Sequence, residues 1–313
     1  MGDSNTTEVN EFILLGISDH PRAQVVMFVV FLIFYLLTLF GNSLLIALII
    51  LSPLLHTPMY FFLCNLSFLD MFYTTSSIPQ MLINCFFRRP TISYTRCIIG
   101  MYVSLFLGIA ECFLLAVMAY DRFAAVCNPL HYTVIMSWKV CIQLAASTWG
   151  SAIVMTLIPR LLQPTQFCGH NIINHFTCEL QAFLKLACSD TRVAEIVIMT
   201  NSFIVLVAPF SFILVTYGRI AQAVMRMHSA KGRGKAFSTC GSHLVVVSIF
   251  YGSALSMYLR PQGKTISDLD KIVSLFYGAV TPMLNPLIYS FRNKDVKGAF
   301  WRLLGKKMKT LPS

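Results

Sequence analysis

Long apolar runs alternate with short polar segments along the whole chain, and this alternation predicts the fold. A helix of about 20 apolar residues crosses the hydrocarbon core of a bilayer. Runs that reach or nearly reach this length lie at about residues 25–51, 58–83, 98–120, 140–158, 196–217, 237–259 and 272–289. The sequence therefore predicts an all-α membrane protein, a seven-transmembrane helix bundle.

A shorter stretch after the last run has a different pattern. From about residue 293 to residue 304, Phe300, Trp301, Leu303 and Leu304 lie among lysines. Such a mixture is typical of a short amphipathic helix on the inner membrane surface.

Composition supports a membrane protein and excludes a soluble domain. Hydrophobic residues make up 56% of the chain and charged residues 12%, with a mean hydropathy of +0.69. In soluble domains about a quarter of the residues are charged. The net charge of +11 does not indicate a nucleic-acid partner, because the basic residues flank the apolar runs instead of gathering on one soluble face.

The distribution of charge also predicts the orientation of the chain. The segment 219–235 contains arginines and lysines but no acid, and the tail after Phe291 is rich in both, with Asp295 as its only acid. The segment 159–195 mixes acids and bases. Because basic loops stay on the cytoplasmic side, we expect the tail inside the cell and the N-terminus outside.

This orientation divides the chain into an extracellular segment 1–24, the bundle 25–290 and a cytoplasmic tail 291–313 that contains the amphipathic helix. The first segment carries a glycosylation sequon at Asn5. It also matches the loose pattern for N-myristoylation, which needs a cytosolic terminus. The expected orientation favours glycosylation of Asn5 over the lipid.

Several sequence motifs lie within the runs or at their ends. The third run closes with Asp121, Arg122 and Phe123, and the string CNPLHY follows at 127–132. The strings LHTPMYFFLCNLSFLD (55–70), KAFSTCGSHL (235–244) and NPLIY (285–289) mark three other runs. Together these motifs resemble the odorant (olfactory) receptor branch of the rhodopsin-like, class A, G-protein-coupled receptors. Phe123 is a departure, since the family usually has Tyr there.

The resemblance implies a receptor that binds a small, mostly apolar, volatile odorant within the bundle. It implies activation of a stimulatory, olfactory-type heterotrimeric G protein that raises cyclic AMP, in a multi-pass protein of the plasma membrane. Neither a cofactor nor an enzymatic activity is expected. A non-olfactory receptor for a small hydrophobic metabolite is an alternative, and a transporter is a weaker one, because no internal repeat and no polar path across the spans is visible.

Two sets of polar residues are candidates for signalling. Arg122 alone could be an anchor at the membrane edge, but its five donors can also be passed between partners. Pro286 removes a backbone hydrogen bond and permits a kink in the last helix. The resemblance assigns G-protein coupling and activation to Asp121, Arg122, Phe123, His243, Asn285, Pro286 and Tyr289.

The second set lies in the middle of the spans, where ionisable groups are costly. It comprises Asn42, Asp70 and Glu111, to which the amide of Asn285 is added. These groups could simply join helices through hydrogen bonds. They could also form a polar centre that holds water, a proton or a sodium ion, because two neighbouring carboxylates do not both stay ionised without a cation.

Candidate ligand-binding residues recur at helical spacing on the outer halves of three runs. Such apolar faces also pack helices together, but the resemblance places odorants between these helices. The absence of Lys and Arg on the faces disfavours a carboxylate ligand. The candidates are Ser104, Leu105, Gly108, Ile109, Cys112, Ser202, Phe203, Leu206, Tyr251, Ala254, Leu255 and Tyr258.

Four of the ten cysteines fall in segments expected outside the cell, where disulfides form: Cys97, Cys168, Cys178 and Cys188. Their spacing leaves three pairings open. The family resemblance implies Cys97 with Cys178 and Cys168 with Cys188.

Overall fold

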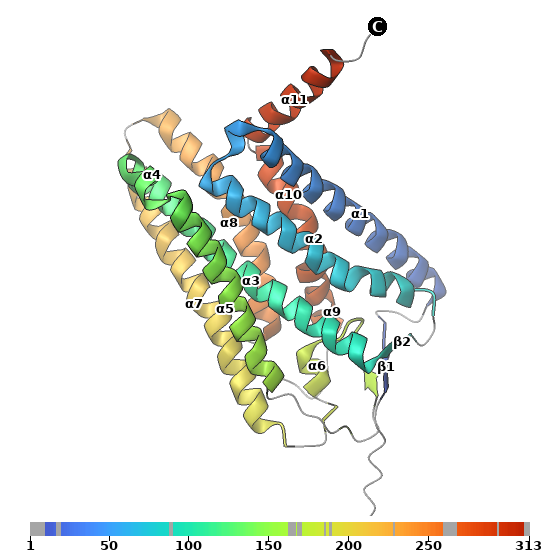
Figure 1. Ribbon diagram of the computed structural model, residues 1–313. Helices are drawn as coiled ribbons and strands as arrows, with labels where there is room; N and C mark the ends of the chain where they lie inside the picture. The colour runs from blue at the N-terminus through green and yellow to red at the C-terminus, as the bar shows by residue number, and fades with distance from the viewer. Residues whose placement is uncertain are drawn as a thin grey trace, which may run out of the picture.

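A computed structural model describes residues 10–16, 20–87, 90–161, 167, 171–184, 186–187, 190–227, 229–258, 268–292 and 294–309. Long helices run side by side through one bundle (Figure 1). They are α1 (Pro21–Leu51), α2 (Pro58–Asn84), α3 (Tyr94–Cys127), α5 (Trp138–Leu161), α7 (Arg192–Met225), α8 (Ala230–Tyr258), and a last crossing made of α9 (Asp268–Leu275), a π-helical turn (Phe276–Val280) and α10 (Thr281–Arg292). Each predicted run forms one of these crossings, so the predicted bundle is confirmed.

The outer surface of the bundle is apolar, as a bilayer requires. Phe40 of α1 is 69% exposed and Val215 of α7 is 64% exposed. In water such side chains would form a large unfavourable patch, whereas in a membrane they contact lipid. Within the described residues, six helical stretches are long and apolar enough to cross a membrane.

The crossing that does not meet this criterion is α2, although its 27 residues are long enough to span the bilayer. Its polar side chains lower its hydropathy, and several of them face other helices. Asp70 and Thr74 are fully buried, and the amide oxygen of Asn65 accepts a hydrogen bond of 3.3 Å from the Trp149 indole of α5. Helix α2 therefore carries much of the polar interior of the bundle.

Helix α3 lies at the centre of the bundle, in contact with α2, α5, α7 and α8. Helices α1 and α10 also pack closely, and this contact depends on a glycine in α1. A Cβ at Gly41 of α1 would lie 3.0 Å from Cγ of Pro286 in α10. Glycine at this position thus lets α1 approach α10 where proline interrupts the helix.

Shorter elements complete one end of the bundle. They are two 3₁₀ turns (Pro53–Leu55 and Pro129–His131), α4 (Tyr132–Ile135) and α11 (Lys294–Lys309). Helix α11 buries Val296 and Ala299 and leaves Trp301 68% exposed. The predicted amphipathic helix is therefore confirmed, while the side chains of Leu303 and Leu304 lie outside the described residues.

A small sheet at the other end of the bundle was not predicted from the sequence. Strand β1 (Glu11–Leu14) lies between β2 (Thr91–Ser93), to which it is antiparallel, and β3 (Ile172–Ile173), to which it is parallel. Phe12 of β1 is fully buried, and its ring lies 5.7 Å from that of Phe183 in α6 (Leu180–Leu184). Figure 1 shows that this sheet and α11 lie at opposite ends of the bundle.

Candidate functional site

A disulfide ties the long segment before α7 to the start of α3. Cys97 and Cys178 are joined, with a Cα–Cα distance of 5.6 Å. This pairing confirms the one implied for these two cysteines. The pairing of Cys168 with Cys188 and the sequon at Asn5 lie outside the described residues, but the neighbouring residues Phe167 and Ala187 form an antiparallel bridge.

Farther from the disulfide, a small cavity of about 40 Å³, here called the inner cavity, lies between α3, α7, α8 and the π-helical turn. It brings together many of the residues that were predicted to bind a ligand. They are Ser104, Leu105, Gly108, Ile109, Cys112, Ser202, Leu206 and Ala254. Three lining residues were not predicted: Asn201, Val205 and Tyr277.

Four other residues that were predicted to bind a ligand are not among the described residues that line this cavity. The Tyr251 hydroxyl is buried and donates to the carbonyl oxygen of Cys112 at 2.8 Å. Leu255 packs against the hydrophobic core, and Phe203 is 56% exposed on the outside of the bundle. The side chain of Tyr258 lies outside the described residues. Tyr251 thus joins α8 to α3 and does not present its hydroxyl to the inner cavity.

Tyr277 lines the inner cavity, and the sequence did not predict it as a ligand-binding residue. Its ring makes an edge contact with Tyr73 at 5.5 Å and packs against Phe250 at 5.3 Å. Its hydroxyl oxygen occupies the space that a Cβ at Gly108 would need. The direction of this side chain depends on the π-helical turn, which regular helical spacing does not reveal.

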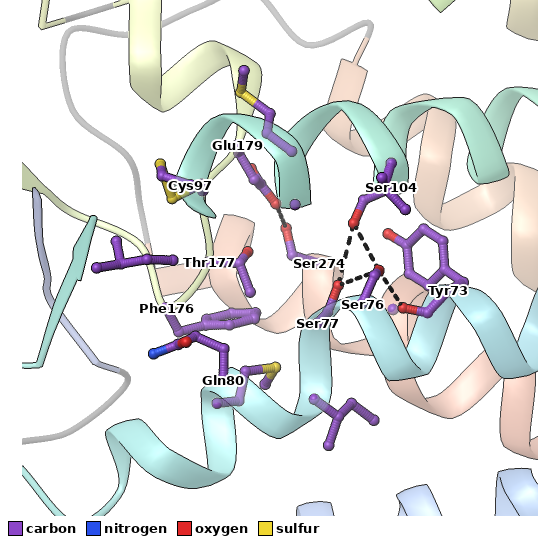
Figure 2. Close-up of a pocket in the computed structure, with 18 of the residues that line it drawn as sticks. Tyr73, Ser76, Ser77, Gln80, Cys97, Ser104, Phe176, Thr177, Glu179 and Ser274 are labelled. Atoms are coloured by element: carbon purple, nitrogen blue, oxygen red, sulfur yellow. Dashed lines mark hydrogen bonds between the residues drawn. A yellow bond between two sulfur atoms is a disulfide. The ribbon is translucent and has the colours of Figure 1, made fainter. Parts of the chain in front are cut away.

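A second and much larger cavity, of about 520 Å³, lies nearer the sheet. Helices α2, α3 and α9, strand β2 and the segment from Phe176 to Leu180 line it. Figure 2 shows the hydroxyls of Ser76, Ser77 and Ser104 gathered in one group, and Glu179 joined to Ser274. We call this the upper cavity; the sheet end, near which it lies, is drawn at the bottom of Figure 1. Ser104, Leu105 and Tyr277 line both cavities, so they separate the two.

The predicted polar centre is assembled in the middle of the bundle. The amide nitrogen of Asn285 donates to both carboxylate oxygens of Asp70, at 3.1 and 3.0 Å. Asn42 donates to the carbonyl oxygens of Thr38 and Pro282, at 3.0 and 3.2 Å. Glu111 is buried and interacts electrostatically with Asp70. These contacts join α1, α2, α3 and α10.

One carboxylate oxygen of the polar centre lacks a protein partner. Oε1 of Glu111 is buried and makes no hydrogen bond to the described residues. No group of three or more His, Cys, Asp or Glu side chains arranged to hold a metal occurs in the described part of the chain. Any cation held here would therefore depend on two carboxylates and neighbouring oxygens.

At the end of the bundle that carries α11, Asp121 is held by the short helix α4. Tyr132 of α4 donates its hydroxyl to Oδ1 of Asp121 at 2.7 Å. Burial and then the neighbouring Asp121 carboxylate raise the pKa of the Tyr132 phenol above its ordinary value, so this phenol stays a donor. Within the described residues no ion pair shorter than 4 Å joins Arg122 to Asp121. The expected release of Arg122 from Asp121 therefore does not start from such a pair in this structure.

Arg122 is buried and interacts electrostatically with side chains of three other helices: Tyr217, Cys240, His243 and Tyr289. The Tyr217 hydroxyl and Nδ1 of His243 lie 2.7 Å apart, and their rings stack. The Tyr289 hydroxyl is buried without a hydrogen-bond partner in the described residues. Phe123 is half-buried and stacks on Tyr120, so the missing hydroxyl of the usual Tyr leaves the ring packed.

Comparison with known proteins agrees with this geometry. The solved structure of squid rhodopsin superimposes with a TM-score of 0.74, covering 90% of this chain and 81% of that chain at 17% identity, and shows the same fold. The fold is that of a seven-helix receptor. Human olfactory receptor 13H1 is 52% identical over 307 residues, 98% of this chain and 100% of that protein. Mouse olfactory receptor 2C1 is 51% identical over 308 residues, 97% of each.

The sequence profile of the olfactory receptor family matches residues 31–307. The chain belongs to this family, and it is an odorant-sensing, G-protein-coupled receptor in the plasma membrane and not an enzyme. Membership of a receptor family argues against the transporter alternative.

Proposed function

We propose that the odorant binds in the inner cavity, and that its binding changes how α8 and α10 pack against α3. The observation that carries this proposal is that eight of the residues predicted to bind a ligand line one cavity. Their side chains are apolar apart from small hydroxyls, a thiol and the nearby Asn201 amide. Such a lining suits a small, weakly polar molecule.

The cavity must enlarge to accept an odorant. Its volume of about 40 Å³ is far below the range of about 300–1,000 Å³ that is usual for ligand sites. Tyr277 stands between this space and the upper cavity of about 520 Å³. Displacement of the Tyr277 ring would join the two spaces, so the odorant selects a packing in which this ring has moved.

The route to the inner surface follows the polar contacts between helices. Tyr251 links α8 to the carbonyl of Cys112, directly at the wall of the inner cavity. Asn285 links α10 to Asp70 of α2. A shift of α8 and α10 would change the surroundings of Arg122, whose neighbours His243 and Tyr289 lie on these helices. Arg122 would then receive a stimulatory G protein, and cyclic AMP would rise.

The polar centre provides a further element of the proposed switch. The unpaired Oε1 of Glu111 beside the Asp70–Asn285 pair suits a shared proton or a sodium ion. Replacing sodium with a large organic cation should then shift agonist potency in the parent receptor. The same replacement should have no effect in Glu111→Gln, and an equal shift in both proteins would contradict a role for this site.

We also propose that the sheet end of the bundle is extracellular and that the tail is cytoplasmic. The Cys97–Cys178 disulfide lies at the sheet end, and disulfides persist in oxidising compartments. The basic segments 219–235 and 291–313 belong to the other side. Asn5 would then carry a glycan within the segment 1–24. Antibody staining of an epitope at Ser313 should require permeabilised cells, and staining of intact cells would reverse the scheme.

The experiment that tests the function is a screen of volatile compounds on cells that express the full chain, read out as cyclic AMP. A compound that activates the parent receptor should fail to activate Arg122→Ala at equal surface expression. Arg122→Lys should recover only part of the signal, since a single ammonium cannot reproduce the guanidinium fork. Full signalling by Arg122→Ala would contradict the coupling role and leave Arg122 as a membrane-edge anchor.

A further inference from the structure

The upper cavity has the size of a binding site in its own right. Its volume of about 520 Å³ lies inside the usual range for small-molecule sites. The disulfide and the segment Phe176–Leu180 form one wall, and the buried face of α2 forms another. Apart from the shared residues Ser104, Leu105 and Tyr277, none of its lining belongs to the inner cavity.

The charged groups around this cavity are few and unequally exposed. Glu179 is the only acid and Arg96 the only base among the described residues that line it. The side chain of Glu179 is 26% exposed, whereas Arg96 is on the exposed surface at the start of α3. Because water and salt screen an exposed guanidinium strongly, the carboxylate sets the charge that a ligand inside the cavity meets.

The carboxylate of Glu179 is positioned but not fully used. The Ser274 hydroxyl donates to Oε1 at 2.7 Å. Nε2 of His175 lies 3.4 Å from the same oxygen but does not form a hydrogen bond with it. The described residues form no hydrogen bond to Oε2. Within the described part of the chain, this oxygen is therefore left to a donor that enters the cavity.

A second acceptor belongs to α2. The amide nitrogen of Gln80 donates to Oδ1 of Asn84 at 2.8 Å, while Oε1 of Gln80 is buried without a partner in the described residues. The hydroxyls of Ser76, Ser77 and Ser104, 3.1–3.3 Å apart, add further acceptors. Buried acceptors without partners are costly, and a ligand rich in donors would satisfy them.

We propose that the upper cavity is a second ligand site, separate from the inner cavity, that takes a small primary amine. A primary ammonium carries three donors and no acceptor, which matches a cavity lined by a carboxylate and by amide and hydroxyl oxygens. The ammonium group binds Glu179, and the alkyl chain packs on the apolar side chains of Phe176, Met81 and Leu275, which line the same space. The site goes beyond the odorant cavity below it, since neither acceptor belongs to that cavity.

Hexylamine and 1-hexanol form a matched pair of probes, since they share a chain and differ in the charged group. Their binding to the purified full-length receptor in lipid nanodiscs can be titrated by saturation-transfer NMR. Glu179→Gln keeps a side chain of the same shape that can still accept from Ser274, but it removes the charge. Glu195→Gln, on the exposed side of α7, makes the same chemical change outside both cavities.

We expect hexylamine to bind the parent receptor at least tenfold more tightly than 1-hexanol. Glu179→Gln should weaken hexylamine binding about tenfold, and Gln80→Leu should weaken it about threefold. Glu195→Gln should leave it unchanged. Leu206→Phe, which fills only the inner cavity, should reduce the response to an inner-cavity odorant and leave hexylamine binding unchanged.

Three results would overturn the proposal: no binding of hexylamine to the parent receptor, unchanged binding in Glu179→Gln, or equal binding of 1-hexanol with the same dependence on Glu179. If Glu179→Gln does not fold, unchanged hexylamine binding in Gln80→Leu overturns it instead. Loss of hexylamine binding in Leu206→Phe would place the amine in the inner cavity, which also contradicts a separate site. An odorant response that survives Leu206→Phe concerns only the inner cavity and leaves the amine site standing.

Discussion

At Gly108 the packing of α3 leaves no room for a side chain, because the Tyr277 hydroxyl occupies that space. Gly108→Ala should therefore push the Tyr277 ring and change the inner cavity. Overpacking a buried position costs about 1–3 kcal/mol, and each 1.4 kcal/mol is about tenfold in affinity. We expect concentration–response curves of inner-cavity odorants to shift by about tenfold or more.

The matched control is Gly150→Ala on α5, where an added Cβ meets nothing within 4 Å. Both variants are compared at equal surface expression in the cyclic AMP assay. Odorant curves that coincide for Gly108→Ala and Gly150→Ala would show that the ligand binds elsewhere.

The Tyr132 hydroxyl holds the Asp121 carboxylate through a hydrogen bond, and its removal should weaken G-protein coupling. Tyr132→Phe removes the hydroxyl that donates to Asp121 at 2.7 Å and keeps the ring. The Asp121 carboxylate would then turn toward Arg122, whose positive charge already acts on it. Because pairing with Asp121 would hold Arg122 back from the G protein, we expect a lower maximal cyclic AMP response at unchanged odorant potency.

A suitable comparison is Tyr35→Phe, which removes an exposed hydroxyl contact between α1 and Thr75 of α2, far along the chain from Asp121. An increase in basal or maximal signalling in Tyr132→Phe would show that the hydroxyl restrains coupling instead of supporting it.

At the scale of single residues, the motif residues could be located from the sequence, whereas part of the pocket could not. Asp121, Arg122 and Asn285 stand in motifs that resemble those of the family, and their roles in coupling stay predictions. Phe203 is as apolar as the buried residues Val205 and Leu206, so its exposed position could not be read from composition. Tyr277 required the backbone path of the π-helical turn, which is set by packing between helices.

At the scale of elements, the Asp70–Asn285 contact is the main polar link between α2 and α10. Asp70→Asn alone replaces the carboxylate with a second amide, and Asn285→Asp alone sets two carboxylates together beside Glu111. The second change should be the worse one, because a buried carboxylate would face like charge. We expect surface delivery to fall most in Asn285→Asp.

The exchanged pair, Asp70→Asn with Asn285→Asp, restores one amide and one carboxylate. It should recover surface delivery relative to Asn285→Asp alone, measured by flow cytometry on intact cells. If the exchanged pair is as poorly delivered as the sum of the single variants predicts, the two side chains act independently.

The helices were predictable because a bilayer span needs a long apolar run, and such runs stand out in any sequence. The strands were not, because β1, β2 and β3 are two to four residues long and pair across distant parts of the chain. The upper cavity was missed for a related reason. Its lining from α2, α3, α9 and the Phe176–Leu180 segment meets only in the folded bundle.

At the scale of the whole molecule, the two ends of the bundle differ in chemistry. The sheet end holds the disulfide, the aromatic cluster around Phe12 and the upper cavity. The opposite end holds Arg122, α4 and the basic α11. In the proposed orientation, a ligand enters at the first end and a G protein binds at the second. The packing of the helices between the two ends would then transmit the signal as a population shift.

The Cys97–Cys178 disulfide joins the segment before α7 to α3 at the sheet end of the bundle. It closes a loop of 81 residues in sequence, and loss of a native disulfide typically costs about 2–5 kcal/mol. Cys97→Ser and Cys178→Ser should each reduce surface delivery and odorant response. The double variant should lose no more than either single variant, because both changes break the same bond. Cys85→Ser, which alters a half-buried free cysteine, should have little effect. Additive losses in the double variant would show that the two thiols act separately and that the bond is not what holds the upper cavity in place.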